Sequence, residues 1–131
     1  MSKNPVVHFE MPYKDAKRVA EFYQKAFGWG MQQMGEEMGQ YVVAVTAETD
    51  ENRMVKTPGT INGGFYNQSL KDASPVPSVV ISVPDLKATV KDIESSGGKM
   101  LREPTEIPGI GLWASFEDSE GNRVSILEAK Q

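Results

Sequence analysis

The chemistry open to this chain depends on one histidine. His8 is the only histidine among 131 residues, and the sequence contains no cysteine. This composition excludes a thiol nucleophile, a zinc–cysteine site, an iron–sulfur cluster and a disulfide. A metal site built on two histidines cannot come from one copy of the chain. A hydrolase triad would have to include His8, and the sequence has no serine-nucleophile elbow.

His8 and Glu10 belong to an alternating, β-rich segment over residues 5–11, which predicts a strand. Residues at i and i+2 of a strand share a face, so these two can cooperate. One hypothesis makes His8 a general base, with Glu10 orienting it or binding a cation. The competing interpretation, which we favour, makes His8 a hydrogen-bonded residue that shapes a ligand site. A buried Glu10 would need a partner such as Arg102 or Arg123.

Three aromatic residues are further candidates for ligand contact or core packing. Trp113 alternates with Gly111 and Ser115, so the three share one strand face. Trp113 is either a stacking wall for a planar ligand or a core or interface tryptophan. Tyr41 could place its hydroxyl in the site or lie at its rim. Trp29 follows a predicted helix, and we expect it in the core.

The first half of the chain, residues 5–66, is predicted to form a strand, a helix and three strands. The helix is predicted over residues 14–27, with Asp15 in its first turn and Gly28 just beyond its end. Its apolar face is expected to comprise Ala16, Val19, Ala20, Tyr23 and Phe27. The strands are expected at 5–11, 31–36, 40–47 and 60–66. The pair Gly63-Gly64 suggests a bulge or the close approach of a backbone or a ligand.

A polar linker, residues 67–77, separates this half from a second copy of the pattern at 78–128. Asp85 is a candidate N-cap for a helix that Gly97-Gly98 ends, and Gly121 supplies a turn. The helical stripe is Leu86, Val90 and Ile93. The strands are expected at 78–83, 99–102, 112–116 and 123–127. Pairing two such units would enclose a concave sheet with helices outside it, which is a natural pocket.

These features resemble the vicinal oxygen chelate superfamily, which includes glyoxalase I, extradiol dioxygenases and bleomycin-resistance proteins. The resemblance covers nearly the whole chain and implies a single domain over 1–131. The expected fold is α+β: two βαβββ modules forming a cup-shaped curved mixed sheet with helices outside, the glyoxalase/bleomycin resistance/dihydroxybiphenyl dioxygenase-like fold. The resemblance is carried by the segments VHFEMP (7–12), FYQKAFGW (22–29), ISVPDL (81–86), GGK (97–99) and FEDSEGN (116–122).

The resemblance also implies where a divalent metal would be bound in metal-using members. The ligand positions carried over from the first and last strands of the modules fall on Val6, Ser78 and Ser125. The fourth lies in the segment 55–71, which contains no Asp, Glu or His. Serine hydroxyls are poor ligands for hard divalent metals. We therefore expect no metal cofactor, and a domain-swapped dimer would not restore the site.

Composition and charge limit the partners. The net charge is −4, the isoelectric point is near 5.0, and the basic residues are scattered, so a nucleic-acid partner is not expected. The chain has neither an apolar run long enough for a membrane helix nor a signal peptide, which fits a cytoplasmic protein. Members of the resembled family commonly pair, so a homodimer is expected.

The expected function is that of a glyoxalase/bleomycin-resistance-like protein that binds a small organic molecule in its cup, without the family's metal. The alternative is a lyase, isomerase or dioxygenase of the glyoxalase I type, either metal-dependent or based on His8, with an atypical site. The candidate catalytic residues are His8 and Glu10. The candidate ligand-binding residues are His8, Glu10, Tyr41, Ser78, Trp113 and Ser125.

Overall fold

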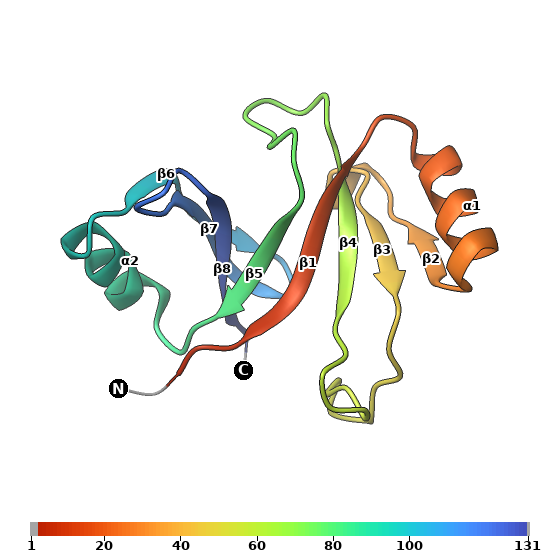
Figure 1. Cartoon of the computed structure of the whole chain (residues 1–131), viewed down its shortest axis with the longest axis horizontal. Helices are drawn as coiled ribbons and strands as arrows, with labels where there is room; N and C mark the ends of the chain where they lie inside the picture. Colours follow the sequence, from red (N-terminus) through yellow and green to blue (C-terminus); the bar gives the residue numbers. More distant parts are fainter. Residues whose placement is uncertain (1–2, 131) are drawn as a thin grey trace. The chain divides into compact units, whose positions relative to one another are not determined.

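Each half of the chain folds into the same order of elements: a strand, a helix and three strands. The structure, a computed structural model, describes residues 3–130 (Figure 1). It consists of two compact units. One is His8–Pro77, and the other joins the chain from Ser78 onward to the residues before His8. The predicted βαβββ repeat is confirmed.

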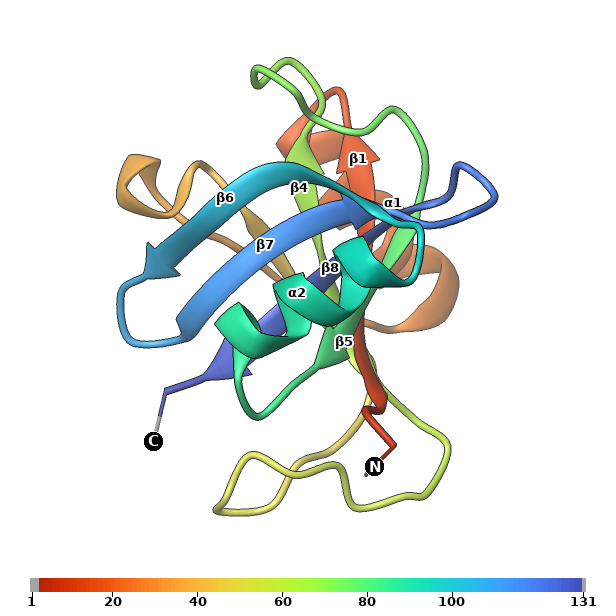
Figure 2. The ribbon, with the colours of Figure 1, turned by 90° about the vertical axis from the view of Figure 1, so that its left-hand side faces the viewer.

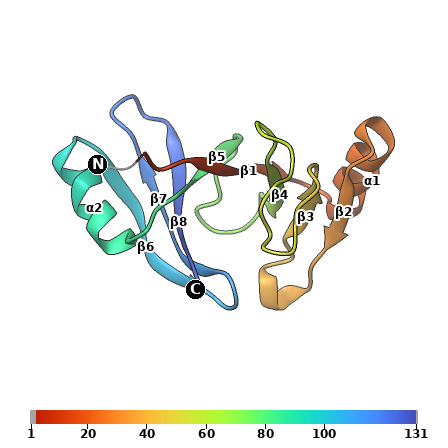
Figure 3. The ribbon, with the colours of Figure 1, turned by 90° about the horizontal axis from the view of Figure 1, so that it is seen from below.

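The first half forms a sheet in the order β2-β3-β4-β1, and α1 lies against it (Figures 1 and 3). The strands β1 and β4 run parallel, whereas the other neighbouring pairs are antiparallel. A short 3-10 turn, η1 (Glu36–Met38), lies between β2 and β3. The element bounds are β1 Val6–Tyr13, α1 Ala16–Phe27, β2 Gly30–Gln33, β3 Val42–Val45 and β4 Asn62–Asn67.

The first helix begins later than predicted because Asp15 caps it. The Asp15 carboxylate accepts a hydrogen bond from the Arg18 backbone N–H at 2.9 Å, and helical geometry starts at Ala16. Gly28 ends the helix with a φ of 73°, a left-handed conformation that glycine adopts without strain. The termination at Gly28 is as predicted.

The helix α1 and the sheet enclose an apolar core. Its buried members are Tyr13, Ala20, Val42, Ala44 and Phe65. Trp29 packs against this cluster and stacks on Tyr23, with ring centroids 4.6 Å apart, so its predicted core position is confirmed. Phe27 lies on the predicted apolar face of the helix, since its ring contacts Tyr23 and Trp29, but it is not buried. Phe27 is 63% exposed, because as the last helical residue it reaches Tyr23 and Trp29 only at the rim of the cluster.

The second half forms a sheet in the order β5-β8-β7-β6, and α2 lies over it (Figure 2). The strands β5 and β8 are parallel, and the other neighbouring pairs are antiparallel. The element bounds are β5 Ser78–Ser82, α2 Leu86–Ser95, β6 Lys99–Ile107, β7 Gly111–Glu117 and β8 Arg123–Ala129. Between residues 3 and 130, no helix is both long and apolar enough to cross a membrane.

The predicted cap and apolar stripe of α2 are both confirmed. Asp85 accepts from the Ala88 N–H at 3.1 Å, and the Glu128 carboxylate accepts from the Leu86 N–H at 2.8 Å. Two of the unpaired N–H groups at the helix start are thus satisfied. The buried core of this half comprises Val83, Leu86, Ala114 and Ile126, with Val90 and Ile93 packed against it.

Two strand predictions need correction. The strand predicted at 31–36 is the shorter β2, because the chain turns into η1 at Glu36. The strand predicted at 99–102 extends to Ile107 in β6. Pro104 suggests a break because it has no N–H to donate. However, β6 is an edge strand whose pairing with β7 shifts register between Arg102 and Thr105, and such a position tolerates proline.

Candidate functional site

His8 and Glu10 project from β1 on the face of the first sheet that points away from α1. Phe9 and Met11, their neighbours in the strand, pack against the core cluster under α1. Alternation along the strand then puts His8 and Glu10 on the opposite face. In the parallel pairing with β4, His8 lies opposite Asn62 and Glu10 opposite Gly64. The predicted common face of His8 and Glu10 is confirmed.

Tyr41 connects these two residues. Its hydroxyl lies 3.1 Å from His8 Nε2 and donates a hydrogen bond to Glu10 Oε2 at 3.4 Å. Tyr41 immediately precedes β3, and its backbone carbonyl accepts from the Met34 N–H at 2.8 Å. The structure therefore places the Tyr41 hydroxyl between the two candidate catalytic residues, and its contact with a ligand stays a prediction. We refer to His8, Tyr41 and Glu10 as the His8 triad.

The glycine pair of β4 makes room for aromatic rings on both faces of the sheet. A Cβ atom at Gly64 would lie 2.1 Å from the Tyr41 ring. A Cβ atom at Gly63 would lie 2.4 Å from the Phe9 ring. Gly63 pairs with Phe9, which packs toward α1, whereas Gly64 pairs with Glu10. The close approach predicted for Gly63-Gly64 thus involves two side-chain rings rather than a backbone or a ligand.

Burial sets the protonation of the His8 triad. Desolvation lowers the pKa of His8 below its ordinary value of 6.5, so the imidazole is neutral at pH 7. Burial raises the pKa of Tyr41, and the charge and hydrogen bond of Glu10 raise it further. Tyr41 therefore keeps its proton, which it donates to Glu10. The Tyr41 oxygen is then left to accept from His8 Nε2–H.

This arrangement leaves His8 Nδ1 as a hydrogen-bond acceptor. A neutral imidazole that carries its proton on Nε2 has a lone pair on Nδ1. Among residues 3–130, the one hydrogen-bond partner of the His8 ring is Tyr41, at Nε2. His8 is also partly exposed. A ligand with an O–H, an N–H or an acidic C–H could therefore address Nδ1.

The other three predicted ligand-binding residues belong to the second sheet. Ala114 and Ile126 pack under α2, so alternation puts Trp113 and Ser125 on the opposite face of β7 and β8. Ser78, at the start of β5, donates its hydroxyl proton to the Arg123 backbone carbonyl at 2.9 Å. The predicted common face of Gly111, Trp113 and Ser115 is confirmed. The role of Ser78, Trp113 and Ser125 in ligand binding stays a prediction.

Sequence reasoning did not find the residue that stacks on Trp113. The Arg102 guanidinium carbon lies 5.7 Å from the centroid of the Trp113 ring, a cation–π distance. Arg102 was considered only as a partner for Glu10. The contact depends on the register of β6 on β7, which is irregular on both sides of Arg102. No local sequence signal encodes that register.

The donors around His8 do not fit a resident divalent metal. Within the part of the chain that the structure describes, no group of three or more His, Asp or Glu side chains is placed to hold a metal ion. His8 Nε2 and Glu10 Oε2 both contact the Tyr41 hydroxyl. Val6, one of the positions carried over from the family, is 45% exposed and offers no donor atom. We therefore derive no chemical step through a metal.

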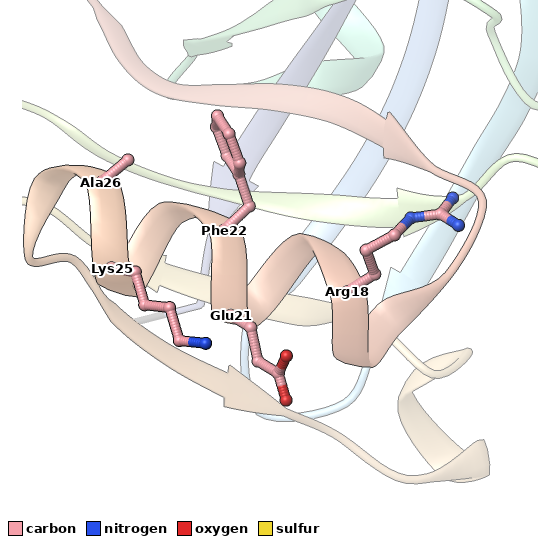
Figure 4. Close-up of a pocket in the computed structure, with 5 residues that line it drawn as sticks. All are labelled: Arg18, Glu21, Phe22, Lys25 and Ala26. Atoms are coloured by element: carbon pink, nitrogen blue, oxygen red, sulfur yellow. The ribbon is translucent and has the colours of Figure 1, made fainter.

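Two surface hollows lie apart from all six predicted ligand-binding residues. One, of about 440 Å³, lies along α1 and is lined by Arg18, Glu21, Phe22, Lys25 and Ala26 (Figure 4). The other, of about 510 Å³, lies in the second half and is lined by Pro84, Glu106, Gly111, Leu112, Glu128, Ala129 and Lys130. Glu128 there already caps α2 through the Leu86 N–H. His8, the one histidine of the chain, lines neither hollow.

The sequence matches known proteins along almost its whole length. Residues 6–126 match the family described as the Glyoxalase/Bleomycin resistance protein/Dioxygenase superfamily. A probable lactoylglutathione lyase of Vibrio cholerae is 26% identical over 133 residues, covering 100% of this chain and 95% of the relative. A glyoxylase-like domain-containing protein of Didymella fabae is 28% identical over 120 residues, covering 89% and 88%.

Solved structures show the same fold at low sequence identity. A variant of Streptomyces coelicolor methylmalonyl-CoA epimerase, in complex with 2-nitronate-propionyl-CoA, superposes with a TM-score of 0.72 at 15% identity. The match covers 99% of this chain and 100% of that one. Methylmalonyl-CoA epimerase from Mycobacterium tuberculosis gives a TM-score of 0.68 at 15% identity, with 96% and 88% covered. At these identities the likeness shows the fold alone.

Proposed function

The chain belongs to the Glyoxalase/Bleomycin resistance protein/Dioxygenase superfamily, and we propose that within it this protein binds a small organic molecule at the His8 triad without a resident divalent metal. The observation that carries the proposal is the Tyr41 hydroxyl between His8 Nε2 and Glu10 Oε2. This contact engages Nε2 of the imidazole, so Nδ1 is the ring nitrogen that a ligand would use.

The triad selects the chemistry of the ligand. His8 Nδ1 is an acceptor, so the group that meets it must be a donor, such as a hydroxyl, an amide or an acidic C–H. Val43 pairs with Gly64 in the sheet, so it presents an apolar side chain on the same face. A small molecule with one donor group and an apolar body fits this combination.

The single histidine makes the proposal directly testable. The Hε1 proton of His8 gives one resonance that belongs to no other residue. We would screen a fragment library in pools by thermal shift, and then follow this resonance during titration with each hit. Ligands that bind at the triad will move the His8 resonance and will lose their thermal shift in His8→Ala.

Tyr41→Phe is the matched control, because it keeps the ring over Gly64 and removes only the hydroxyl. Ligands that use Nδ1 should bind less well to this variant, since His8 loses the partner that fixes its tautomer. Hits that stabilise wild type and His8→Ala equally would place the ligand elsewhere and contradict the proposal.

Proton transfer at His8 is the second candidate function, and the same hydrogen-bond chain favours it. His8 Nδ1 would take a proton from an acidic C–H, which leaves an imidazolium that still donates from Nε2 to Tyr41. The Glu10 carboxylate, which accepts from Tyr41, would stabilise that positive charge. The proton would then return to the same or an adjacent carbon, as in an isomerase or a lyase.

The names of the relatives supply the substrates for this second test. We would incubate the protein in D₂O with methylmalonyl-CoA, and separately with lactoylglutathione, and follow deuterium incorporation by NMR. Exchange above the His8→Ala background would establish an enzyme. Binding of ligands at the triad without exchange would leave the protein a binding protein.

The homodimer implied by the family and the cytoplasmic location expected from the sequence stay proposals. Sedimentation equilibrium over a range of protein concentrations would show whether the chain pairs. A separate measurement would be needed to identify the surface that a dimer buries and how apolar it is.

A further inference from the structure

Two phenylalanine side chains of α1 are exposed although the helix packs its apolar face on the first core. Phe22 is 57% exposed and Phe27 is 63% exposed, and their ring centroids lie 6.4 Å apart with the rings edge to face. Single exposed apolar side chains are ordinary on a protein surface, whereas adjacent ones are typical of a surface that contacts another molecule. The outer side of α1 is therefore a candidate interface.

Charged side chains surround Phe22 on this side of the helix. Figure 4 shows Arg18, Phe22 and Ala26 along one side of α1, with Glu21 and Lys25 along the neighbouring side. Both rows follow the four-residue spacing that puts helical side chains next to each other. All five residues line the hollow of about 440 Å³. Phe22 thus lies among two positive charges and one negative charge.

The order of these charges is complementary to itself. In an antiparallel pair of α1 helices, a twofold axis at the level of Tyr23 puts Glu21 of one copy opposite Lys25 of the second copy. The same axis puts Lys25 of the first copy opposite Glu21 of the second. Phe22 lies one residue from the axis in each copy, so the two exposed rings meet and cover each other. One arrangement therefore satisfies both charge pairs and buries the apolar centre.

Arg18 favours the same register. With the axis at Tyr23, Arg18 lies opposite Gly28 of the second copy, at the C-terminal end of α1, where the helix carbonyl groups carry partial negative charge. An axis between Glu21 and Phe22 would instead bring Arg18 against Lys25 of the second copy. That register juxtaposes like charges, so the charges select the first arrangement.

We infer that the outer face of α1, which consists of Arg18, Glu21, Phe22, Lys25 and Ala26, pairs with the same face of a second copy of this chain. Contacts between identical patches around a twofold axis are the commonest in homo-oligomers. The 12-residue helix is about 18 Å long, so one helix pair buries less than the roughly 1,200–2,000 Å² of a stable interface. We expect a weak dimer, with a dissociation constant in the micromolar range. The inference rests on the homodimer proposed above and is independent of the His8 triad.

Charge-swap variants test the pairing and its register. Glu21→Lys puts two lysines opposite each other, and Lys25→Glu does the same with two glutamates. In sedimentation equilibrium we expect each variant alone to dimerise at least about tenfold more weakly than wild type. An equimolar mixture of the two should dimerise as tightly as wild type, because opposite charges meet again. The double variant Glu21→Lys/Lys25→Glu should be restored for the same reason.

Two further variants separate the face from general effects of charge and folding. Lys91→Glu makes the same charge change at an exposed position of α2 and should leave the dimer unchanged. Phe22→Ala removes an exposed ring, so it should weaken the dimer without lowering the melting temperature of the dilute protein.

The outcomes distinguish this inference from the homodimer itself. A wild-type dimer that Glu21→Lys and Phe22→Ala leave unchanged would keep the homodimer and overturn the pairing through α1. A mixture of the two charge variants that stays monomeric would also overturn it. A wild-type chain that is monomeric up to about 1 mM would overturn both proposals and leave ligand binding at the His8 triad untouched.

Discussion

Tyr41 determines what His8 can do. Without the Tyr41 hydroxyl, a partly buried imidazole beside a carboxylate would be expected to form an ion pair with it or to share a cation. The hydroxyl instead lies between His8 and Glu10 and separates their polar atoms. The carboxylate still acts on the imidazole, but through a neutral phenol that keeps its proton because its pKa is raised. The triad thus presents a neutral acceptor to a ligand.

The lowered pKa of His8 predicts how stability depends on pH. The unfolded chain takes up a proton near pH 6.5, whereas the folded chain takes it up at a lower pH. The unfolded state therefore binds more protons in this interval, so stability is complete above pH 6.5 and falls as the pH drops toward the folded-state pKa. We expect the difference in melting temperature between pH 7.5 and pH 5 to be smaller in His8→Gln than in wild type. An equal difference in both proteins would contradict the lowered pKa.

The alternation of side chains along a strand predicted that His8 and Glu10 lie together, but it could not predict that Tyr41 joins them. His8 and Glu10 share a face because they are two residues apart in one strand, which the sequence shows directly. Tyr41 meets Glu10 across a separation of 31 residues. That meeting depends on β4 lying between β1 and β3, which follows from the sheet order and not from any local pattern. Gly64 was the one feature of the sequence that pointed to this contact, because a residue without a side chain leaves space for a neighbouring ring.

Among the elements, β4 positions the triad through Gly64. Gly64→Ala would put a Cβ atom 2.1 Å from the Tyr41 ring, so the ring must move. We expect a loss of about 1–3 kcal/mol in the free energy of unfolding, as for other overpacked sites. The His8 Hε1 resonance should shift as the hydrogen bond to Tyr41 breaks. Urea unfolding and the NMR spectrum would report the two effects.

Gly63→Ala is the matched comparison for this prediction, because its Cβ atom would strike Phe9 on the opposite face. It should lower stability as well, through the core, but should change the His8 resonance much less. A Gly64→Ala variant with an unchanged His8 resonance would show that the ring position does not control the imidazole.

The start of α2 allows a second prediction for an element. Asp85→Ala removes the acceptor for the Ala88 N–H and should cost about 0.5–2 kcal/mol. The loss of stability should lie toward the lower end of this range, because Glu128 still accepts a hydrogen bond from the Leu86 N–H. Chemical denaturation would measure the difference. Asp92→Ala, an aspartate inside the same helix that makes no cap, should be neutral or stabilising. Equal losses in the two variants would contradict the capping role.

Element types followed from the sequence more reliably than element ends. The sequence predicted the apolar faces of the helices, the helix caps and the strands that form the two cores. These were predictable because the periodicity and the turn residues agree with tertiary packing. The edge strand β6 was underestimated because Pro104 is compatible with a strand only where the ladder is irregular. Phe27 follows the predicted apolar face, but its exposure could not be predicted, because a periodic pattern continues to the last turn of a helix even where the core has ended.

For the whole molecule, the repeat explains the fold but not the chemistry. Both halves share the order strand, helix and three strands, and each encloses its own core. The side chains on the sheet face away from the helix differ completely. The first half carries the His8 triad, whereas the second carries Trp113 with the Arg102 guanidinium carbon 5.7 Å from its ring centroid. Family membership therefore identifies the scaffold, and the substituted side chains decide the function.

A zinc titration followed through His8 tests the central claim most directly. We would treat the protein with chelator, remove the chelator, and record the Hε1 resonance of His8 while adding Zn²⁺ up to one equivalent and beyond. The account predicts no stoichiometric change, because the His8 and Glu10 donors engage Tyr41 and no third ligand joins them among residues 3–130. A new resonance that saturates at one equivalent, and that is absent in His8→Ala, would contradict it.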